Sequence, residues 1–483
     1  MARWAATHAP LSVLAVMATL FGASLCSPLH HPCYSEDPDV PCDSFSASNT
    51  HADDDSSPPF PAVKREGNGD IQQPGHEAVS YTGYKLLRAN VEDSKLPVVD
   101  SLDTAEGVDL WSWRRKGRSH MFEVDLLTPP AAEPKVKQLF SANNLPYQEV
   151  IKDLQDAINK QKDDFFFSWN RPAHPMTWEK YHSFDEMEQY LYFLEAEYPH
   201  LVTLEEIGYS SENRSLKVAK VSTGPNRTAI WIDGGMHARE WIAPATTMYI
   251  LYRLVENAWE FPELVNNFDW YILPIANPDG YEFSRTKDRL WRKTRSINPA
   301  FPDCVGVDPN RNFGYKWATK GSSNYPCSSI YHGPEPFSEP ETKAMADFLL
   351  THKDELKVYV TIHAYSQMWM APWSSSHTLA ANNKDLIEVG QKAVEAIKSY
   401  NATEYALGTV PDLLYLASGS SMDFAHGTAG IPYSYALELR DRGNYGFILP
   451  KEQIHPTAQE TFLGIRAMTE AIFHKLYPGK KFV

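Results

Sequence analysis

The sequence predicts an α/β fold, in which helices cover both faces of a central sheet, preceded by a smaller α+β domain. Two observations carry this prediction. From about Trp178 to the C-terminus, short apolar runs alternate with segments whose apolar residues recur at helical spacing. Such alternation is typical of a sheet flanked by helices. A shorter region that begins at Tyr81 has strand-like runs and a helical segment of its own.

The length and composition allow more than one domain. The chain has 483 residues, of which 43% are hydrophobic and 12% are aromatic, so it can bury a large core. The formal net charge is -16, whereas a nucleic-acid partner would require a basic face. We therefore expect no nucleic-acid partner.

The N-terminus has the pattern of a secretory signal. A positive charge at Arg3 precedes an apolar run over residues 11–21, and small residues follow at 22–24. The run is shorter than the roughly 20 residues that a membrane-spanning helix needs. We predict a signal peptide over residues 1–26, a secreted protein and no membrane association. Residues 27–80, rich in Pro, Ser, Asp and Gly, predict a disordered acidic extension.

The cysteines agree with an oxidising compartment. One of the five, Cys26, ends the predicted signal peptide. The other four allow three connectivities, and their separation in the chain favours the local bridges Cys33–Cys42 and Cys304–Cys327. Free thiols are the alternative, which a secreted chain disfavours.

The region after residue 80 predicts a compact α+β domain. Strands are expected over residues 81–88 and 120–127, and a helix is expected over residues 149–162. A charged segment over residues 159–164 and then Arg171-Pro172 follow. This pattern fits a removable pro-segment and equally an ordinary N-terminal domain with a linker, and composition does not decide between them.

The C-terminal region predicts the elements of the larger sheet. Helices are expected over residues 183–198 and 338–352, each opened by a capping box, and over residues 242–257. The expected strands are residues 216–221, 229–232, 270–275, 358–362 and 433–439. Residues 275–335 are long and irregular, and such loops over a sheet usually carry function.

A candidate metal site lies where the strand over 229–232 meets the following helix. His237 and Glu240 are three residues apart there, and His363 stands at the end of another strand. Two close ligands and one distant ligand, of His and carboxylate type, suit a catalytic zinc ion with an open position. A lone histidine at a strand end is more often a hydrogen-bonded core residue, so His363 depends on the other two.

Five motifs occur in order along this region: residues 237–241 (HAREW), 290–295 (LWRKTR), 308–312 (DPNRN), 361–363 (TIH) and 437–441 (LELRD). Together they resemble the zinc metallocarboxypeptidases of the pancreatic A/B type. The resemblance covers Trp178 to the C-terminus closely and residues 81–166 more loosely. It implies a catalytic domain over 172–483 with a mixed, mostly parallel twisted sheet. It also implies a ferredoxin-like activation pro-domain and linker over 81–171.

The resemblance assigns roles at the metal site. It implies that His237, Glu240 and His363 hold one Zn²⁺ ion per catalytic domain. It implies that Glu438 is the general base that activates water and that Arg295 stabilises the oxyanion. From the residues alone, a structural ion pair for Glu438 and a solvated charge for Arg295 would be preferred.

The resemblance also assigns substrate contacts. Asn310 and Arg311 would bind the terminal carboxylate of the substrate, because a guanidinium binds a carboxylate in a bidentate way. Arg239 and Tyr415 would add further contacts, although Tyr415 by itself fits a core aromatic residue in an apolar run. The pocket base falls on Met422, which predicts a preference for hydrophobic C-terminal residues.

Three further assignments depend on the resemblance. Asp308 would be the partner of a zinc-bound histidine. Cys304 and Cys327 match the family's disulfide. A shift of one residue would instead put Asp423 at the pocket base, which would favour C-terminal Lys or Arg.

We therefore predict a secreted zymogen of a zinc exopeptidase that hydrolyses the C-terminal peptide bond of peptides and proteins. Its own pro-domain is the expected inhibitor, a trypsin-like protease acting between Lys160 and Arg171 is the expected activator, and a monomer is expected. The alternatives are a carboxypeptidase specific for basic residues and, with less support, an inactive zinc- or peptide-binding homologue.

Overall fold

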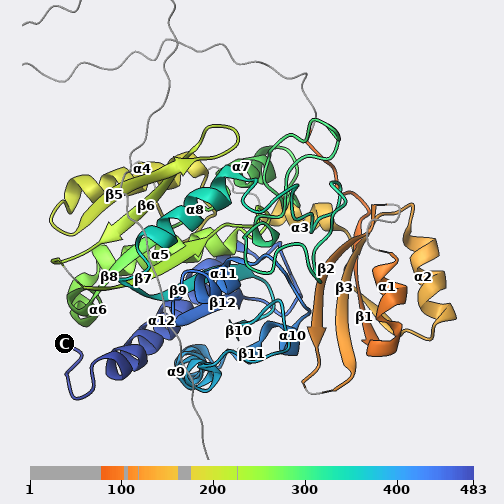
Figure 1. Ribbon diagram of the computed structural model, residues 1–483. Helices are drawn as coiled ribbons and strands as arrows, with labels where there is room; N and C mark the ends of the chain where they lie inside the picture. Colours follow the sequence, from red (N-terminus) through yellow and green to blue (C-terminus); the bar gives the residue numbers. More distant parts are fainter. Residues whose placement is uncertain (1–77, 103–106, 118, 162–173, 175, 226) are drawn as a thin grey trace, which may run out of the picture. The chain divides into compact units, whose positions relative to one another are not determined.

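The computed structural model describes residues 78–483, except for residues 103–106, 118, 162–173, 175 and 226. They form a small domain, residues 78–161, and a large domain, from residue 174 to the C-terminus (Figure 1). The predicted signal peptide, nearly all of the extension, the Cys33–Cys42 bridge and the segment from residue 162 to Arg171 lie outside the described residues.

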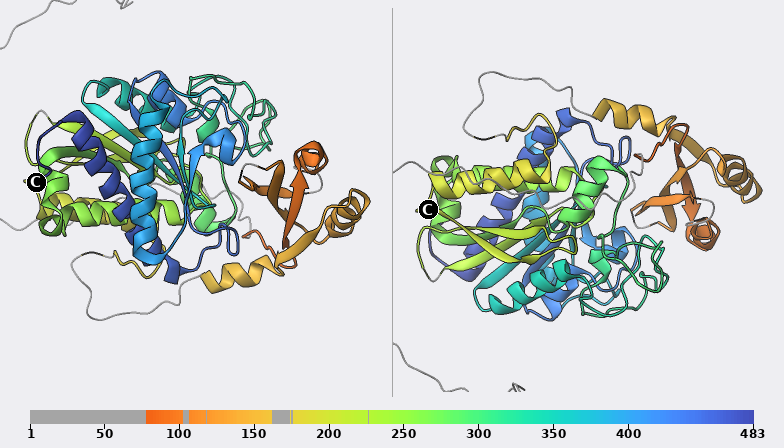
Figure 2. Two further views of the ribbon diagram at one scale, coloured as in Figure 1. Left: turned by 90° about the horizontal axis from the view of Figure 1, so that it is seen from below. Right: turned by 90° about the horizontal axis from the view of Figure 1, so that it is seen from above.

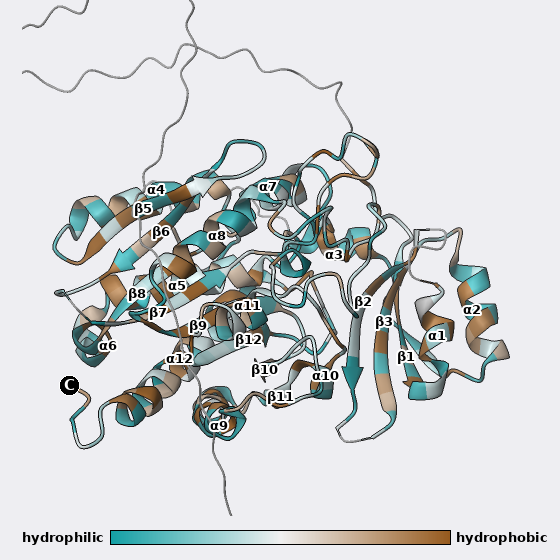
Figure 3. Cartoon of the chain, in the orientation of Figure 1, coloured by the Kyte–Doolittle hydropathy of each residue, from teal (hydrophilic) through white to brown (hydrophobic). Residues whose placement is uncertain are grey.

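The small domain has a four-stranded antiparallel sheet with strand order β2-β3-β1-β4. Its elements are β1 (Lys85–Glu92), α1 (Leu96–Asp100), β2 (Asp109–Arg115), β3 (Met121–Thr128), α2 (Glu133–Ala142), β4 (Tyr147–Ile151) and α3 (Leu154–Gln161). This order confirms the ferredoxin-like prediction. Val136 and Phe140 of α2 face the sheet, and hydrophilic residues cover the outer side of the helix (Figure 3).

Two boundaries in the small domain differ from the prediction. The helix expected over residues 149–162 begins only at Leu154, because residues 147–151 pair with β1 as strand β4. The first strand begins at Lys85 and not at residue 81. Tyr81 is buried, and its hydroxyl donates to Asp288 of the large domain at 2.5 Å.

The large domain is built on an eight-stranded mixed sheet with order β11-β10-β12-β9-β7-β8-β6-β5. Its strands are β5 (Val202–Tyr209), β6 (Ser215–Val221), β7 (Thr228–Gly234), β8 (Phe268–Leu273), β9 (Leu356–Ala364), β10 (Met368–Ala371), β11 (Ala406–Thr409) and β12 (Tyr433–Leu439). The central strands β12, β9, β7 and β8 are mutually parallel. This confirms the predicted mixed, mostly parallel sheet.

Helices cover both faces of this sheet, as Figure 2 shows. They are α4 (Phe184–Glu197), α5 (Ile242–Val255), α6 (Pro262–Asn267), α7 (Pro278–Thr286), α8 (Pro340–Thr351), α9 (Asn383–Asn401), α10 (Val410–Leu413), α11 (Ser421–Gly427) and α12 (Ile454–Leu476). Helices α5, α9 and α12 pack together on one face, and α8 and α11 share a second core on the other. Residues of β7 are therefore buried on both sides, which explains their continuous apolar character.

The two predicted capping boxes have different outcomes. Ser183 caps α4 by accepting the backbone N–H of Glu186, whose side chain accepts the N–H of Ser183, so that capping box is confirmed. At α8 the N-cap residue is Glu339, its side chain forms no capping hydrogen bond, and Pro340 opens the helix. Ser338 instead donates its hydroxyl to Glu339, so the second box was wrong.

The long irregular region after α7 is held by a disulfide bond between Cys304 and Cys327. Buried polar contacts also hold it. Thr294 donates its hydroxyl to Val307 O at 3.2 Å, and Lys293 donates to Pro326 O at 2.7 Å.

Within the described part of the chain, no helix has the length and hydropathy needed to cross a bilayer.

Candidate active site

The metal-ligand candidates lie where the central parallel strands end. β7 ends at Gly234, and the turn before α5 carries His237 and Glu240, whereas His363 is the second-last residue of β9. A Cβ atom on Gly234 would lie 2.3 Å from Thr247 Oγ1, and Gly235 has a φ of +66°. Both glycines are therefore required for the turn that directs the two side chains.

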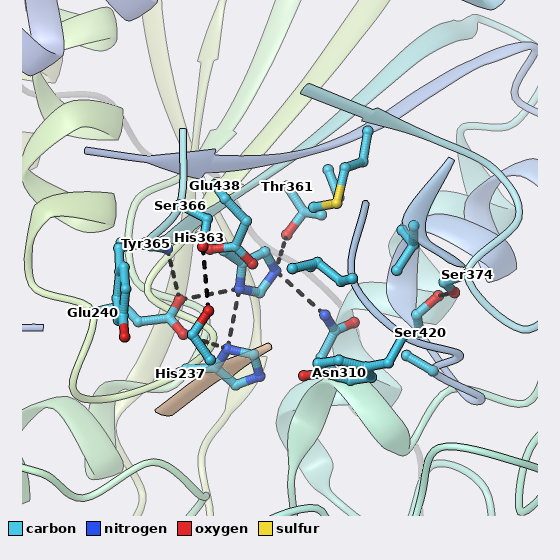
Figure 4. Close-up of a pocket in the computed structure, with 18 of the residues that line it drawn as sticks. His237, Glu240, Asn310, Thr361, His363, Tyr365, Ser366, Ser374, Ser420 and Glu438 are labelled. Atoms are coloured by element: carbon cyan, nitrogen blue, oxygen red, sulfur yellow. Dashed lines mark hydrogen bonds and ion pairs between the residues drawn. The ribbon is translucent and has the colours of Figure 1, made fainter. Parts of the chain in front are cut away.

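The structure brings the three predicted ligands together (Figure 4). His237 Nδ1 lies 2.8 Å from Glu240 Oε1, and His363 Nδ1 lies 3.1 Å from His237 Nδ1 and 3.2 Å from Glu240 Oε2. All three side chains are buried. Two ligands about 2.1 Å from one zinc ion at a tetrahedral angle lie roughly 3.4 Å apart, so the spacing fits that ion.

The hydrogen bonds of His237 explain why this cluster fits a cation. Asp308 Oδ1 accepts from His237 Nε2 at 3.1 Å, which places the ring proton on Nε2 and a lone pair on Nδ1. The Nδ1 atom and the Glu240 carboxylate therefore face each other as two hydrogen-bond acceptors, with no proton between them to donate. The cluster therefore offers an anionic, three-ligand set that suits Zn²⁺.

Asp308 is itself held by Arg292. Arg292 donates to Asp308 Oδ2 from Nη2 at 2.8 Å and from Nε at 3.2 Å. Although Asp308 is fully buried, the Arg292 charge holds the pKa of its carboxyl group well below the usual range. Arg292 also lines the pocket beside the cluster, and its Nη1 lies 3.8 Å from Glu240 Oε1.

Glu438 lies beside the cluster on the neighbouring strand. The parallel register of β12 and β9 pairs Glu438 with His363. The side chain lines the pocket, and its Oε2 atom has no hydrogen-bond partner among the described residues. Burial, and then the charge of Glu240, raises the pKa of Glu438 well above its usual value. A carboxylate with a free oxygen and a raised proton affinity can serve as a general base.

Arg295, the predicted oxyanion contact, does not reach this site. Its guanidinium stacks 3.6 Å from the Phe283 ring and 4.4 Å from the Trp291 ring, and its Nε lies 3.8 Å from Glu212 Oε1. Three residues earlier in the same loop, Arg292 faces the cluster instead. The resemblance assigned this role to Arg295, whereas the structure places Arg292 of the same LWRKTR motif, and not Arg295, among the residues that line the pocket.

Asn310 and Arg311 form one wall of the same pocket. They lie in a 3₁₀ turn, η4 (Pro309–Arg311), whose N-cap is Asp308. Arg311 is buried and donates from Nε to Gly321 O at 2.8 Å and from Nη1 to Asn310 O at 2.9 Å. Asn310 Oδ1 accepts from Ser421 N at 3.0 Å. These hydrogen bonds hold an amide and a guanidinium rigidly at the pocket.

Apolar side chains form another part of the pocket wall. The apolar lining residues include Met370, Val410, Leu414, Ala417, Met422 and Ala436. The neighbour of Met422, Asp423, points away from this space. Its carboxylate accepts the backbone N–H groups of Ser374 at 2.8 Å and Ser375 at 3.0 Å, and it is fully buried.

Tyr415 and Arg239 occupy the rim. Tyr415 is 37% exposed and lines the pocket, so it is not a core aromatic residue. Arg239 borders an adjoining cavity that Arg292 also lines. Its guanidinium lies 4.1 Å from the Phe447 ring and donates to Asp109 Oδ2 of the small domain at 2.6 Å.

Strand β2 of the small domain lies against this pocket. Trp111, Ser112 and Trp113 are among the lining residues. The Trp111 ring packs on Phe447 at 4.9 Å, and the Trp113 ring lies 6.2 Å from Tyr415. The sequence reasoning missed these contacts. No signal in the sequence identifies them, because they depend on how the two domains dock.

Polar contacts fix the small domain at both sides of this strand. Tyr365 of the large domain donates to Asp125 Oδ2 at 2.8 Å, and Asp125 is fully buried. At the end of α3, Gln161 donates to Leu449 O at 2.8 Å and accepts from Arg289 Nε at 2.8 Å.

Comparisons with known proteins agree with this arrangement. Residues 187–464 match the family model of zinc carboxypeptidases, and residues 88–161 match that of the carboxypeptidase activation peptide. Carboxypeptidase B of Astacus astacus is 44% identical over 62% of this chain and 98% of its own length. Carboxypeptidase A2 of Rattus norvegicus is 40% identical over 72% of this chain and 84% of its own length.

Two solved structures resemble both domains together. Carboxypeptidase A from Helicoverpa armigera matches with a TM-score of 0.74 and 30% identity over 82% of this chain and 98% of that one. Thrombin-activatable fibrinolysis inhibitor matches with a TM-score of 0.72 and 33% identity over 80% of this chain and 97% of that one. The chain therefore belongs to the zinc carboxypeptidase family and carries the family's activation peptide before its catalytic domain.

Proposed function

We propose that this protein is a secreted zymogen whose catalytic domain removes C-terminal residues, preferably hydrophobic ones, from peptides and proteins. One observation carries the proposal. A single pocket combines the His237, Glu240 and His363 cluster, the unpartnered Glu438 carboxylate and the Arg311 guanidinium. An exopeptidase needs a group that activates water and a cation that binds the free chain end, and both are present there.

The residues of this chain divide the reaction between them. Asn310 and Arg311 bind the terminal carboxylate, and Tyr415 closes over the bound residue from the rim. Zinc, held by the three ligands at one ion per catalytic domain, supplies a Lewis acid when it is bound. Glu438 takes a proton from the attacking water and returns it to the leaving amine.

Arg292 replaces Arg295 as the oxyanion contact in this proposal. Its guanidinium lines the pocket and is held in place by Asp308, so it is already oriented before substrate binds. A preorganised cation of this kind stabilises negative charge that develops on the carbonyl oxygen. Arg239 contributes a further substrate contact once Asp109 has left it.

The hydrophobic preference rests on the pocket wall. Met422 and Met370 line the pocket, and both are flexible apolar side chains that adapt to different ligand shapes. Asp423, which would favour a basic residue, does not line the pocket, and its carboxylate accepts two backbone N–H groups. The named relatives include both A and B types, so their names do not decide this preference.

The small domain inhibits the enzyme by occupying the substrate cleft. The Asp109 carboxylate pairs with Arg239, and the Trp111 and Trp113 side chains line the pocket. We propose residues 81–171 as the pro-domain and linker, and residues 172–483 as the catalytic domain. Cleavage by a trypsin-like protease between Lys160 and Arg171 removes the small domain and yields a monomeric enzyme.

Secretion, directed by residues 1–26, is supported by the disulfide bond between Cys304 and Cys327, since such bonds persist in oxidising compartments.

The test is digestion of matched peptides that end in Phe, Leu, Arg or Lys by the trypsin-treated protein, read by mass spectrometry. We expect stepwise loss from the C-terminus, with kcat/KM higher for Phe and Leu. Glu438→Gln should abolish turnover and retain peptide binding. Undiminished turnover by that variant would refute the mechanism, and faster cleavage of Arg peptides would refute the preference alone.

A matched control is Glu404→Gln. Glu404 is an exposed carboxylate that accepts from Lys398 at 2.9 Å on the surface, and it does not line the pocket. This variant should keep the activity of the unaltered enzyme. A loss in the control would show that the assay reports general damage and not the loss of the base.

A further inference from the structure

Behind the metal ligand His363 lies a second buried carboxylate that the proposed chemistry does not use. Asp233, near the end of β7, is fully buried, and it has no salt-bridge partner in the described parts of the chain. Its Oδ1 accepts from the Thr361 hydroxyl at 2.7 Å, and its Oδ2 accepts from Trp231 Nε1 at 2.8 Å. A buried carboxylate held only by neutral donors costs stability, so its position calls for another explanation.

The sheet itself creates this arrangement. The parallel register of β7 and β9 sets Asp233 directly beside Thr361. Thr361 and His363 are two residues apart on β9, so their side chains point to the same face. As a result, Thr361 Oγ1 lies 3.1 Å from His363 Nε2, on the side of the ring that faces away from His237 and Glu240 (Figure 4).

The direction of these hydrogen bonds determines the tautomer of His363. The Thr361 hydroxyl has one proton, and it donates that proton to Asp233. Two groups lie near His363 Nε2: Thr361 Oγ1 at 3.1 Å and, farther away, Asn310 Nδ2 at 3.4 Å. In the shorter contact the hydroxyl has no proton left, so His363 Nε2–H donates to Thr361 Oγ1. The lone pair of the ring is then on Nδ1, which is the atom that faces the other two ligands.

We propose that Asp233 and Thr361 are positioning residues for the metal ligand His363, in which Asp233 acts through the Thr361 hydroxyl to present the Nδ1 lone pair to zinc. His237 has a direct counterpart in Asp308. Both histidine ligands are thus oriented by buried carboxylates, one of them directly and one through a hydroxyl group. Such contacts raise ligand basicity, and their loss typically costs about 10–100-fold in metal affinity.

The substitution Asp233→Asn tests the direction of the relay. The amide oxygen of Asn would face Trp231 Nε1, which needs an acceptor, so its NH₂ group would face Thr361 and donate to it. The Thr361 hydroxyl would then donate to His363 Nε2, which moves the ring proton to Nδ1. We expect the zinc dissociation constant of the full-length protein to rise about 10–100-fold, measured by chelator competition.

Thr361 provides a pair of variants that separates the hydroxyl group from packing. Thr361→Val removes the hydroxyl and keeps the shape, so it should weaken zinc binding as Asp233→Asn does. Thr361→Ser keeps the hydroxyl and should bind zinc within about threefold of the unaltered protein. The matched control is Thr246→Val, because Thr246 is equally buried and its hydroxyl has no partner among the described residues.

A second readout is the visible absorption spectrum of the Co²⁺-substituted protein, which responds to ligand geometry and not to global stability. We expect the bands to shift in Asp233→Asn and Thr361→Val, and to remain unchanged in Thr361→Ser and Thr246→Val. Wild-type zinc affinity in both Asp233→Asn and Thr361→Val would overturn the proposal. Equal losses in Thr361→Ser and Thr361→Val would also overturn it.

This inference rests on the proposed zinc chemistry, and the experiment keeps the two apart. If the unaltered protein bound no zinc, the proposed function itself would fail. If the unaltered protein and all four variants bound zinc equally, only the positioning role would fail.

Discussion

The contact between Asp109 of the small domain and Arg239 of the catalytic domain predicts how strongly the zymogen is held closed. Arg239 Nη1 donates to Asp109 Oδ2 at 2.6 Å, and only 4% of the arginine is exposed. In Asp109→Ala, the guanidinium loses its carboxylate partner within a covered cleft. Hydrogen bonds to charged groups contribute about 1.5–3 kcal/mol, so we expect a loss of about 2 kcal/mol.

That loss raises the equilibrium constant for movement of the small domain out of the cleft about 30-fold, since 1.4 kcal/mol is a factor of ten. The small domain should remain attached, because the Tyr365–Asp125 and Gln161–Leu449 contacts are unchanged. The residual activity of uncleaved zymogen toward a peptide ending in Phe should therefore rise by roughly the same factor. After trypsin treatment, the variant and the unaltered enzyme should have equal kcat and KM.

Glu133→Ala is the matched control for this experiment. Glu133 pairs with Lys85 and Lys137 within the small domain, so its loss does not change the cleft. Asp109→Asn should give an intermediate increase, because its amide oxygen still accepts from Arg239 without the negative charge. Residual activity of Asp109→Ala within twofold of the unaltered zymogen would refute the reasoning that this pair holds the cleft closed.

Three further predictions follow from contacts in the catalytic domain. Arg292→Ala should lower kcat about 10²–10³-fold, whereas Arg295→Ala should leave it within about threefold; equal effects in steady-state kinetics would contradict the assignment of Arg292. Burial raises the pKa of Glu341 to about 7, so the folded state binds this proton more tightly than the unfolded chain. The free energy of unfolding should therefore fall by about 3 kcal/mol as the pH rises from about 4.5 to 7. Thermal unfolding of Glu341→Gln should lack this decline. The same pH dependence in the variant and in the unaltered protein would contradict the prediction. Replacing Cys304 and Cys327 with Ala opens a loop with a sequence separation of 23 and should cost about 3 kcal/mol. In the trypsin-treated enzyme, which lacks the other predicted bridge, the thermal midpoint should be lower and reductant should no longer change it; a midpoint still sensitive to reductant would contradict this.

The central strands could be predicted because each is buried on both faces. β7, β8, β9 and β12 form continuous apolar runs, and these were found within one or two residues at most ends. The strands that the prediction missed are different. β5 is half-exposed at one edge of the sheet, and β10 and β11 have only four residues each. Their pairing partners define them more than their own pattern does.

The metal ligands could be expected from the sequence because two of them are three residues apart and the third lies at the end of a strand. The oxyanion contact could not, since Arg292 and Arg295 differ only in direction within a loop that no periodicity describes. Asp109 and Trp111 belong to the site through docking of another domain. Asp233 joins it only through the register of β7 and β9, which the sequence of either strand does not specify.

That register has a consequence for which parts of the chain can change. Asp233, Thr361, His363 and Glu438 stand on three adjacent parallel strands, aligned by one continuous ladder of backbone hydrogen bonds. Inserting or deleting one residue within any of these strands would turn its side chains to the opposite face of the sheet. Loops between the strands can lengthen or shorten without moving these four groups, so variation in this protein should accumulate in the connections and be excluded from the ladder.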